Sequence, residues 1–456
     1  MVARGLARVG RVALLGAAIV AVGGGAALAA AAPGWPMRQD GGYLVVDTPH
    51  YQIRTDHSAD IAQLVASHQE ALFQELYRRL AGNKPVPLMP RLEVQVFSAQ
   101  EKYMDAVGKE GKGTQGMFSQ QQIKGWAPAG AIDNLLGTLR HEGTHQFVAQ
   151  FIGPKCPLWL NEGLAEFFQQ AQFKNGQLET GQVPAPEANL LKRNLEAGKL
   201  IPLDKILSIT VQDWNSNVRA EALNAQLQYA EAWSIVHFLQ GADGGRYRGP
   251  FIQYIYYISR SRSPAEAWEK AFGAGTRALQ ERWHAYLKDL KPTGGLTCRD
   301  KLGLIARWLA GVHQHEEVAK DMATFRQAAV DGKFGGWSGT WGDGSKLEIN
   351  EKDALKDLFR CPDDAKTPAD ESSYEMGPPA KEGEPPVLRC RHHAGYVLET
   401  SYEKNDQGGW TISIVSRPAL PGAKDTATPG RKSAGAAEKK PAAAPAPTPA
   451  AGARQP

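Results

Sequence analysis

The pattern that most clearly points to chemistry is the run His141-Glu142-Gly143-Thr144-His145, which reads H-E-x-x-H. Four residues make about one turn of an α-helix, so a helix here would place both imidazoles on one face, where they can bind a single metal ion. Glu142 would project about 100° further around, beside the coordination position that the imidazoles leave open. Zinc suits this geometry, and the pattern predicts a site for one zinc ion.

A catalytic zinc ion needs a third protein ligand and one position for water. Glu162 follows His145 by sixteen residues, in the run W-L-N-E-G-L-A-E of residues 159–166. Gly153-Pro154 should end the first helix, so a second helix beginning near Asn161 can return antiparallel and present Glu162 from its first turn. Glu166, one turn later on the same face, could accept the other ring N–H of a ligating histidine.

Together, H-E-x-x-H and the downstream W-L-N-E-G-x-A-E resemble the gluzincin zinc metallopeptidases, in particular their peptidase-MA-like branch, over about residues 43 to 290. The resemblance implies that His141, His145 and Glu162 bind zinc, that Glu142 is the general base and that Glu166 supports the ligands. It also implies a small mixed sheet followed by helices. The sixteen-residue spacing is slightly shorter than in the zinc aminopeptidases.

The same resemblance points to a phenol near the metal, for which Tyr229 on a later predicted helix is the candidate; a packing role is the alternative. Zinc aminopeptidases carry an acidic G-x-M-E-N segment before the metal-binding helix, whereas residues 116–119 here read G-M-F-S and hold no carboxylate. We therefore expect an endopeptidase acting on protein or peptide substrates. A cell-wall amidase, or a non-catalytic envelope protein that keeps zinc for structure or peptide binding, are the alternatives.

The composition is that of a soluble globular protein: 42% of the 456 residues are hydrophobic and 22% are charged, with a net charge of +4. The positive charge lies in the two ends of the chain, so we expect no nucleic-acid partner. Residues 1–29 resemble a signal peptide with Ala27-Leu28-Ala29 as the cleavage site, and an uncleaved anchor is the alternative. We therefore expect export to the periplasm, cell envelope or medium, with the N-terminal segment or the basic tail available for envelope association.

Four cysteines, Cys156, Cys298, Cys361 and Cys390, fit disulfide formation in an exported protein. Three pairings are possible, and we favour Cys361 with Cys390 because both lie in the C-terminal region. Buried thiols are the competing interpretation.

Hydrophobic periodicity predicts an α+β fold with strands first and helices after. In the gluzincin-like domain, residues 43–290, we expect strands at 43–48, 51–55, 92–97, 116–119 and 122–126, and helices at 61–80, 133–152, from 161, 220–240, 250–261, 264–272 and 276–290. A smaller α+β domain, residues 295–419, should contain a helix at 302–330, a loop at 362–386 and strands at 387–391, 396–402 and 410–415. The Ala/Pro/Lys-rich tail, residues 420–456, should be disordered.

Overall fold

The computed structural model describes residues 34–81, 86–119, 121–174, 176–220, 222–293, 297–313, 320–334, 337–340, 346–349, 351–361, 371–392, 396–405 and 409–418. The predicted signal peptide and the predicted disordered tail lie outside these ranges. The chain divides into two compact units, Met1–Gly34 and Trp35–Pro456, and everything below concerns the second. Among the described residues, no helix combines the length and the apolar character needed to cross a bilayer.

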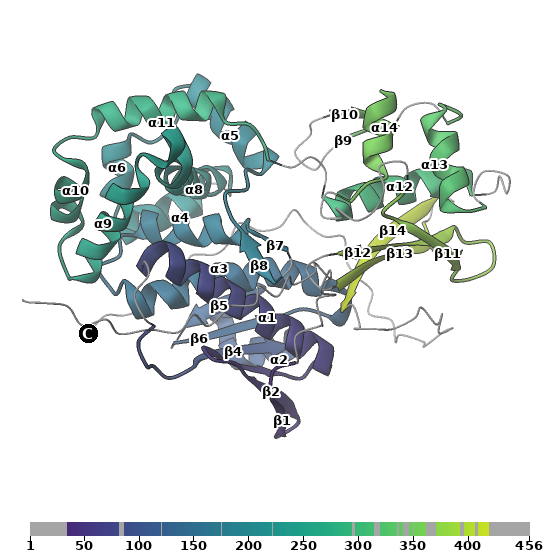
Figure 1. The fold of residues 1–456 in the computed structure, drawn as a ribbon, viewed down its shortest axis with the longest axis horizontal. Helices are drawn as coiled ribbons and strands as arrows, with labels where there is room; N and C mark the ends of the chain where they lie inside the picture. Colours follow the sequence, from purple (N-terminus) through teal and green to yellow (C-terminus); the bar gives the residue numbers. More distant parts are fainter. Residues whose placement is uncertain are drawn as a thin grey trace, which may run out of the picture. The chain divides into compact units, whose positions relative to one another are not determined.

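A six-stranded mixed sheet opens the second unit and confirms the predicted α+β class (Figure 1). Its strand order is β1-β2-β3-β4-β6-β5, with β4 parallel to both β3 and β6 and the other pairs antiparallel. The strands are β1 (Met37–Asp40), β2 (Tyr43–Asp47), β3 (Tyr51–Thr55), β4 (Leu92–Phe97), β5 (Gly116–Ser119) and β6 (Gln122–Trp126).

The first strand was not predicted, because β1 lies in a Pro/Gly-rich lead and all four of its residues are exposed. It pairs with β2 through a turn at Gly41 and Gly42, whose φ angles of 55° and 83° lie in the region that glycine adopts without strain. The other five strands confirm the expected segments to within one residue.

Two long helices pack on the sheet (Figure 1). Helix α1 (Ala59–Leu76), capped by the Ser58 hydroxyl and extended by a π-helical turn at Tyr77–Ala81, packs on β2 and β3. Helix α3 (Ile132–Phe151) packs on β5, β6 and α1. The short α2 (Gln100–Val107) contacts β4 and β6. The helix that carries H-E-x-x-H is therefore held against a rigid sheet.

A mainly helical region follows α3 and begins with α4, the helix that carries Glu162. Its elements are α4 (Leu158–Gln169), the strand pair β7 (Gln172–Lys174) and β8 (Gln177–Glu179), α5 (Ala185–Glu196), α6 (Leu203–Leu207), α7 (Val211–Ala220), α8 (Ala222–Gly245, with non-helical backbone at 242–244), α9 (Arg248–Ser259), α10 (Pro264–Phe272) and α11 (Arg277–Asp289). The α5–α7 segment and the β7–β8 pair were not predicted. Helices α4 and α8 pack directly on each other.

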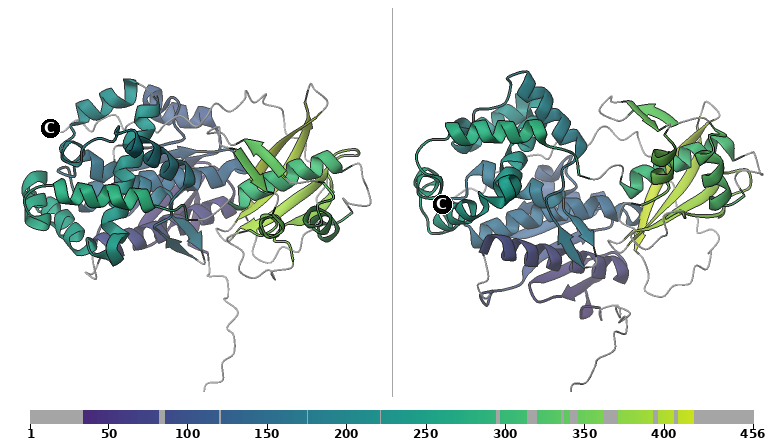
Figure 2. Two further views of the ribbon diagram at one scale, coloured as in Figure 1. Left: turned by 90° about the horizontal axis from the view of Figure 1, so that it is seen from above. Right: turned by 45° about the horizontal axis from the view of Figure 1, so that its top comes forward.

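The C-terminal region has its own hydrophobic core, formed by helix α12 against a four-stranded antiparallel sheet of order β11-β12-β13-β14 (Figure 2). Its elements are α12 (Cys298–Val312), α13 (Met322–Val330), β9 (Trp337–Thr340), β10 (Lys346–Ile349), α14 (Lys352–Leu358), β11 (Glu375–Pro379), β12 (Pro386–His392), β13 (Tyr396–Lys404) and β14 (Trp410–Pro418).

Two secondary-structure predictions for this region were wrong. The single helix expected at 302–330 is two helices, because Asp321 caps a new helix through the backbone N–H of Thr324. The loop expected at 362–386 contains β11, since Met376 and its neighbours pair with β12 despite their prolines. Such pairing suits the edge of a sheet, where proline's missing N–H is not needed.

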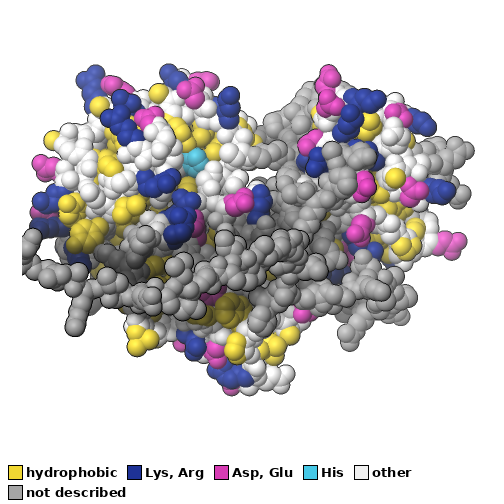
Figure 3. Space-filling view, in the orientation of Figure 1, with side chains coloured by type: hydrophobic (Ala, Val, Ile, Leu, Met, Phe, Trp, Pro, Cys, Tyr) yellow, Lys and Arg dark blue, Asp and Glu magenta, His cyan; other side chains and the backbone are white. Residues whose placement is uncertain are grey.

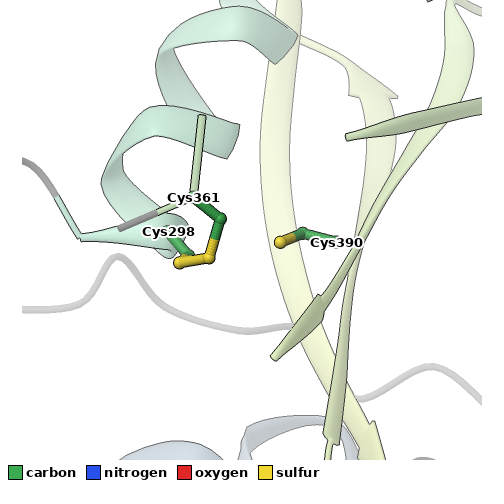
Figure 4. A group of neighbouring side chains, drawn as sticks. All are labelled: Cys298, Cys361 and Cys390. Carbon is green, nitrogen blue, oxygen red and sulfur yellow. A yellow bond between two sulfur atoms is a disulfide. The ribbon is translucent and has the colours of Figure 1, made fainter. Parts of the chain in front are cut away.

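The disulfide prediction was also wrong: Cys361 pairs with Cys298, with 4.7 Å between their Cα atoms (Figure 4). The physical reason is that the start of α12 lies against the end of α14. Lys301 of α12 donates to the backbone oxygens of Asp357 and Arg360 at 2.7 and 3.0 Å, which holds Cys361 beside Cys298.

On the face shown in Figure 3, basic and acidic side chains of the described residues alternate and do not gather into a patch of one sign.

Candidate metal centre

The turn between α3 and α4 sets the position of the third candidate ligand. Gly153 has a φ of 91°, which favours glycine and turns the chain out of α3. Helix α4 begins after Pro157, whose backbone is extended, and packs against α3. It starts at Leu158, three residues earlier than expected, so Glu162 lies in its second turn and not its first.

The structure brings His141, His145 and Glu162 together. The Glu162 Oε2 atom is 3.7 Å from His141 Nε2 and 3.6 Å from His145 Nε2, and one ligand atom from each residue lies within 4.8 Å of the others. Two ligand atoms on a tetrahedral ion, each about 2.1 Å from it, are separated by about 3.4 Å. The observed spacing therefore fits one metal ion, and it is too long for direct hydrogen bonds between the carboxylate and the rings.

Burial of the three ligand side chains favours a bound cation. His141, His145 and Glu162 are only 4%, 6% and 3% exposed. Burial raises the pKa of Glu162 to about 8. Burial, together with the neighbouring His145, lowers the pKa of His141 well below its usual value. A carboxylate removed from water without a partner is costly, and a metal ion supplies that partner.

The second nitrogen of each imidazole faces an oxygen from α4. His145 Nδ1 lies 3.0 Å from Asn161 Oδ1, and His141 Nδ1 lies 3.4 Å from Glu166 Oε1. Asn161 Oδ1 is therefore within hydrogen-bond distance of His145 Nδ1, whereas the contact between His141 Nδ1 and Glu166 does not have the geometry of a hydrogen bond. The sequence predicted that Glu166 accepts a ring proton from a ligating histidine; the structure places its carboxylate beside His141 but shows no hydrogen bond between them. Asn161 was missed, although it stands in the W-L-N-E run directly before the ligand.

The side chain of Glu142 reaches from α3 to β5, the strand at one end of the six-stranded sheet. Its Oε2 accepts a 2.8 Å hydrogen bond from the backbone N–H of Phe118. Burial raises its pKa, while His145 and the Phe118 amide act in the opposite direction. Gly116 allows this close approach, because a Cβ there would lie 2.6 Å from Thr138 Cγ2 and 3.5 Å from Glu142 Cγ. The sequence did not reveal that β5 holds this carboxylate.

Tyr229 of α8 is buried in the same neighbourhood. Burial is the main cause of its strongly raised pKa, and the carboxyls of Glu162, Glu166 and Glu142 raise it further, so the phenol lies within electrostatic reach of the centre. Its ring packs edge-on against Trp214, with 5.2 Å between the ring centroids. Trp214 was not singled out from the sequence, since a lone tryptophan on a polar helix carries no signal of its own.

The protein therefore belongs to the α+β class and contains a buried candidate metal centre formed by two histidines and one carboxylate. The chain matches one family model, described as Protein of unknown function (DUF1570), over residues 135–265. This stretch contains all three candidate ligands and Glu142. No curated protein and no solved structure matches the chain.

Proposed function

We propose that this protein is a zinc-dependent peptidase in which Glu142 is the general base. The observation that carries the proposal is the convergence of two imidazole nitrogens and one carboxylate oxygen on a point beside a second, separately held carboxylate. A structural metal site closes its coordination sphere with four protein ligands, whereas three ligands and a neighbouring base are what a hydrolytic site requires.

His141, His145 and Glu162 would hold the ion, and their nitrogen and oxygen donors suit zinc. Zinc bound there would lower the pKa of its water to about 7 and polarise a substrate carbonyl. Asn161 and Glu166 would fix the orientation and tautomer of the two rings, as partners of ligating histidines commonly do.

Glu142 would take the proton from the attacking water and return it to the leaving amine. The Phe118 N–H keeps this carboxylate on the β5 side of α3 and leaves its second oxygen available for the proton. Tyr229 would donate a hydrogen bond to the oxyanion of the substrate, because its raised pKa keeps the phenol protonated at neutral pH.

The substrate class we propose is an extended polypeptide cleaved internally. Strand β5 ends the sheet order and lies next to Glu142, so an extended chain could pair with it through main-chain hydrogen bonds. The segment Gly116–Ser119 has no carboxylate to bind a substrate amino terminus, which favours endopeptidase over aminopeptidase action. Export from the cytoplasm remains part of the proposal.

The test is metal analysis together with peptide-library cleavage on purified wild-type protein and on the Glu142→Gln variant. We expect one zinc ion per chain in both and a loss of cleavage of at least about 10²-fold in the variant, since removal of a general base costs this much. Glu281→Gln, at an exposed position on α11, is the matched control and should cleave like the wild type.

Equal cleavage by the wild type and Glu142→Gln would remove the catalytic assignment. Stoichiometric zinc with no cleavage of any peptide by the wild type would instead favour a non-catalytic, peptide-binding role for the centre.

A further inference from the structure

The phenol of Tyr229 has a buried tryptophan as its neighbour. Trp214, on helix α7, is 0% exposed. Its ring packs edge-on against the Tyr229 ring, with 5.2 Å between the ring centroids and 86° between the ring planes. The one buried side chain in the described part of α7 therefore lies against the candidate oxyanion donor.

The indole nitrogen of Trp214 is buried and makes no hydrogen bond among the described residues. An N–H removed from water without an acceptor is unfavourable, and such groups are rare in folded proteins. Burial and the carboxyl of Glu162 raise the pKa of Tyr229, whereas the Trp214 N–H lowers it, as a donor near the phenol oxygen does. The N–H therefore lies close to this oxygen without the alignment of a hydrogen bond.

The backbone of Trp214 is held as well as its ring. Its amide N–H donates to the carbonyl oxygen of Thr210 at 2.9 Å, and its carbonyl oxygen accepts from the side chain of Gln228 at 3.4 Å. Gln228 directly precedes Tyr229 on α8, so one turn of this helix contacts Trp214 at both its backbone and its ring. A small rotation of either ring is then enough to align the indole N–H with the phenol oxygen.

We propose that Trp214 is a positioning residue for Tyr229: its indole N–H donates a hydrogen bond to the phenol oxygen and so directs the phenol proton toward the substrate. An indole N–H is a donor only, whereas a phenol can both donate and accept. Facing this donor, the phenol oxygen accepts, and its own proton is available for a second acceptor. The inference rests on the proposed function, in which that acceptor is the oxyanion of the substrate.

A packing role alone is the alternative for Trp214. As a hydrophobic anchor of α7 it would act through the buried area of its rings, most of which phenylalanine would also supply. A packing residue would matter equally whether or not position 229 carries a hydroxyl. A positioning residue acts only through that hydroxyl, so the two roles differ in a double-mutant cycle.

The first measurement requires no enzymatic activity. Isotope labelling of the indole nitrogens gives one NMR signal for each of the eleven tryptophans of the full-length protein, and the Trp214 signal is the one missing from Trp214→Phe. Phenylalanine at position 229 keeps the neighbouring ring and removes only the oxygen. We expect Tyr229→Phe to move the Trp214 signal upfield, because a hydrogen-bonded proton resonates at lower field than a free one.

An unmoved Trp214 signal would overturn the proposal. If Trp214→Phe does not fold, the spectra of the wild type and Tyr229→Phe decide by themselves. An upfield shift of one indole signal would support the hydrogen bond, and a complete match of the indole signals would overturn it.

The second measurement is a double-mutant cycle on kcat for peptide cleavage. We expect Trp214→Phe to lower kcat about 3–10-fold, the effect of one hydrogen bond between neutral groups. In the Tyr229→Phe background the same substitution should change kcat less than about twofold. Trp268→Phe is the matched control, because this buried indole nitrogen also makes no hydrogen bond among the described residues and its ring packs on Tyr254 instead. It should leave kcat unchanged in both backgrounds.

Equal losses of kcat from Trp214→Phe in the two backgrounds would assign Trp214 to packing and overturn the positioning role, while the proposed peptidase would stand. A wild type that binds zinc but cleaves no peptide would instead remove the proposed function. The indole signal would then decide whether Trp214 donates to Tyr229.

Discussion

Gly163 directly follows the ligand Glu162, and its replacement by alanine tests how tightly α4 is positioned. A Cβ at this position would lie 2.5 Å from the backbone oxygen of Ala232 and 2.9 Å from Val236 Cγ2, both on α8. Ordinary contact begins at 3.4 Å. Helix α4 would therefore have to move away from α8 by about 0.9 Å, because backbone atoms cannot rotate aside as a side chain can.

The expected cost follows from this displacement. Overpacking of a core costs about 1–3 kcal/mol or more, and the higher helix propensity of alanine offsets only about 0.5–1 kcal/mol of it. We expect a net loss of about 2 kcal/mol in the free energy of unfolding. Metal–ligand distances tolerate about ±0.2 Å, so a shift of Glu162 by several tenths of an ångström should also weaken zinc binding at least about tenfold.

The assays are urea unfolding of the metal-free protein and zinc competition against a chromophoric chelator. Gly137→Ala on α3 is the matched control, since its Cβ would meet only Arg140 Nη2 at 3.8 Å, and we expect it to be neutral or stabilising. The loss of unfolding free energy in Gly143→Ala should lie between those of Gly163→Ala and Gly137→Ala. The atoms that the new Cβ would meet belong to the side chains of Leu72 and Gln69, which can move aside. If Gly163→Ala matched the wild type in both unfolding and zinc affinity, the packing argument would be refuted.

Two further predictions concern neighbours of the centre, and a third concerns Glu231, a buried carboxyl of α8. Asn161→Ala should weaken zinc binding about 10–100-fold, because His145 Nδ1 loses the oxygen that orients the ring; unchanged chelator competition would contradict this role. Tyr229→Phe should lower kcat and leave zinc content unchanged, and an unaltered kcat would assign the phenol to packing. Burial raises the pKa of Glu231 to about 8 from 4.5, so the folded state holds this proton more tightly than the unfolded state, and stability falls as pH rises from 4.5 to 8. Glu231→Gln should flatten that part of the stability curve measured by urea unfolding at a series of pH values, whereas parallel curves for variant and wild type would show that Glu231 does not titrate in this range.

Local patterns predicted much of the fold, because the hydrophobic periods of strands (2 residues) and helices (3.6 residues) can be recognised within a short stretch of sequence. Strand β3, for example, alternates buried and partly buried side chains along its whole length. The same patterns failed where an element buries few residues. Strand β8 buries only Leu178, and among the described side chains of α7 only Trp214 is buried. Such segments have little periodic signal, and their conformation depends on the surface against which they pack.

For the candidate centre, the sequence by itself determined the relation between His141 and His145, because one helix sets it. The spacing and the helix-ending Gly153 also pointed correctly to Glu162. Only the tertiary structure decided that Asn161 faces a ligand ring, that the Phe118 amide holds Glu142, and that Cys361 pairs with Cys298. The last two contacts join residues far apart in the chain, and all three depend on how one element packs against another, which spacing along the sequence does not encode.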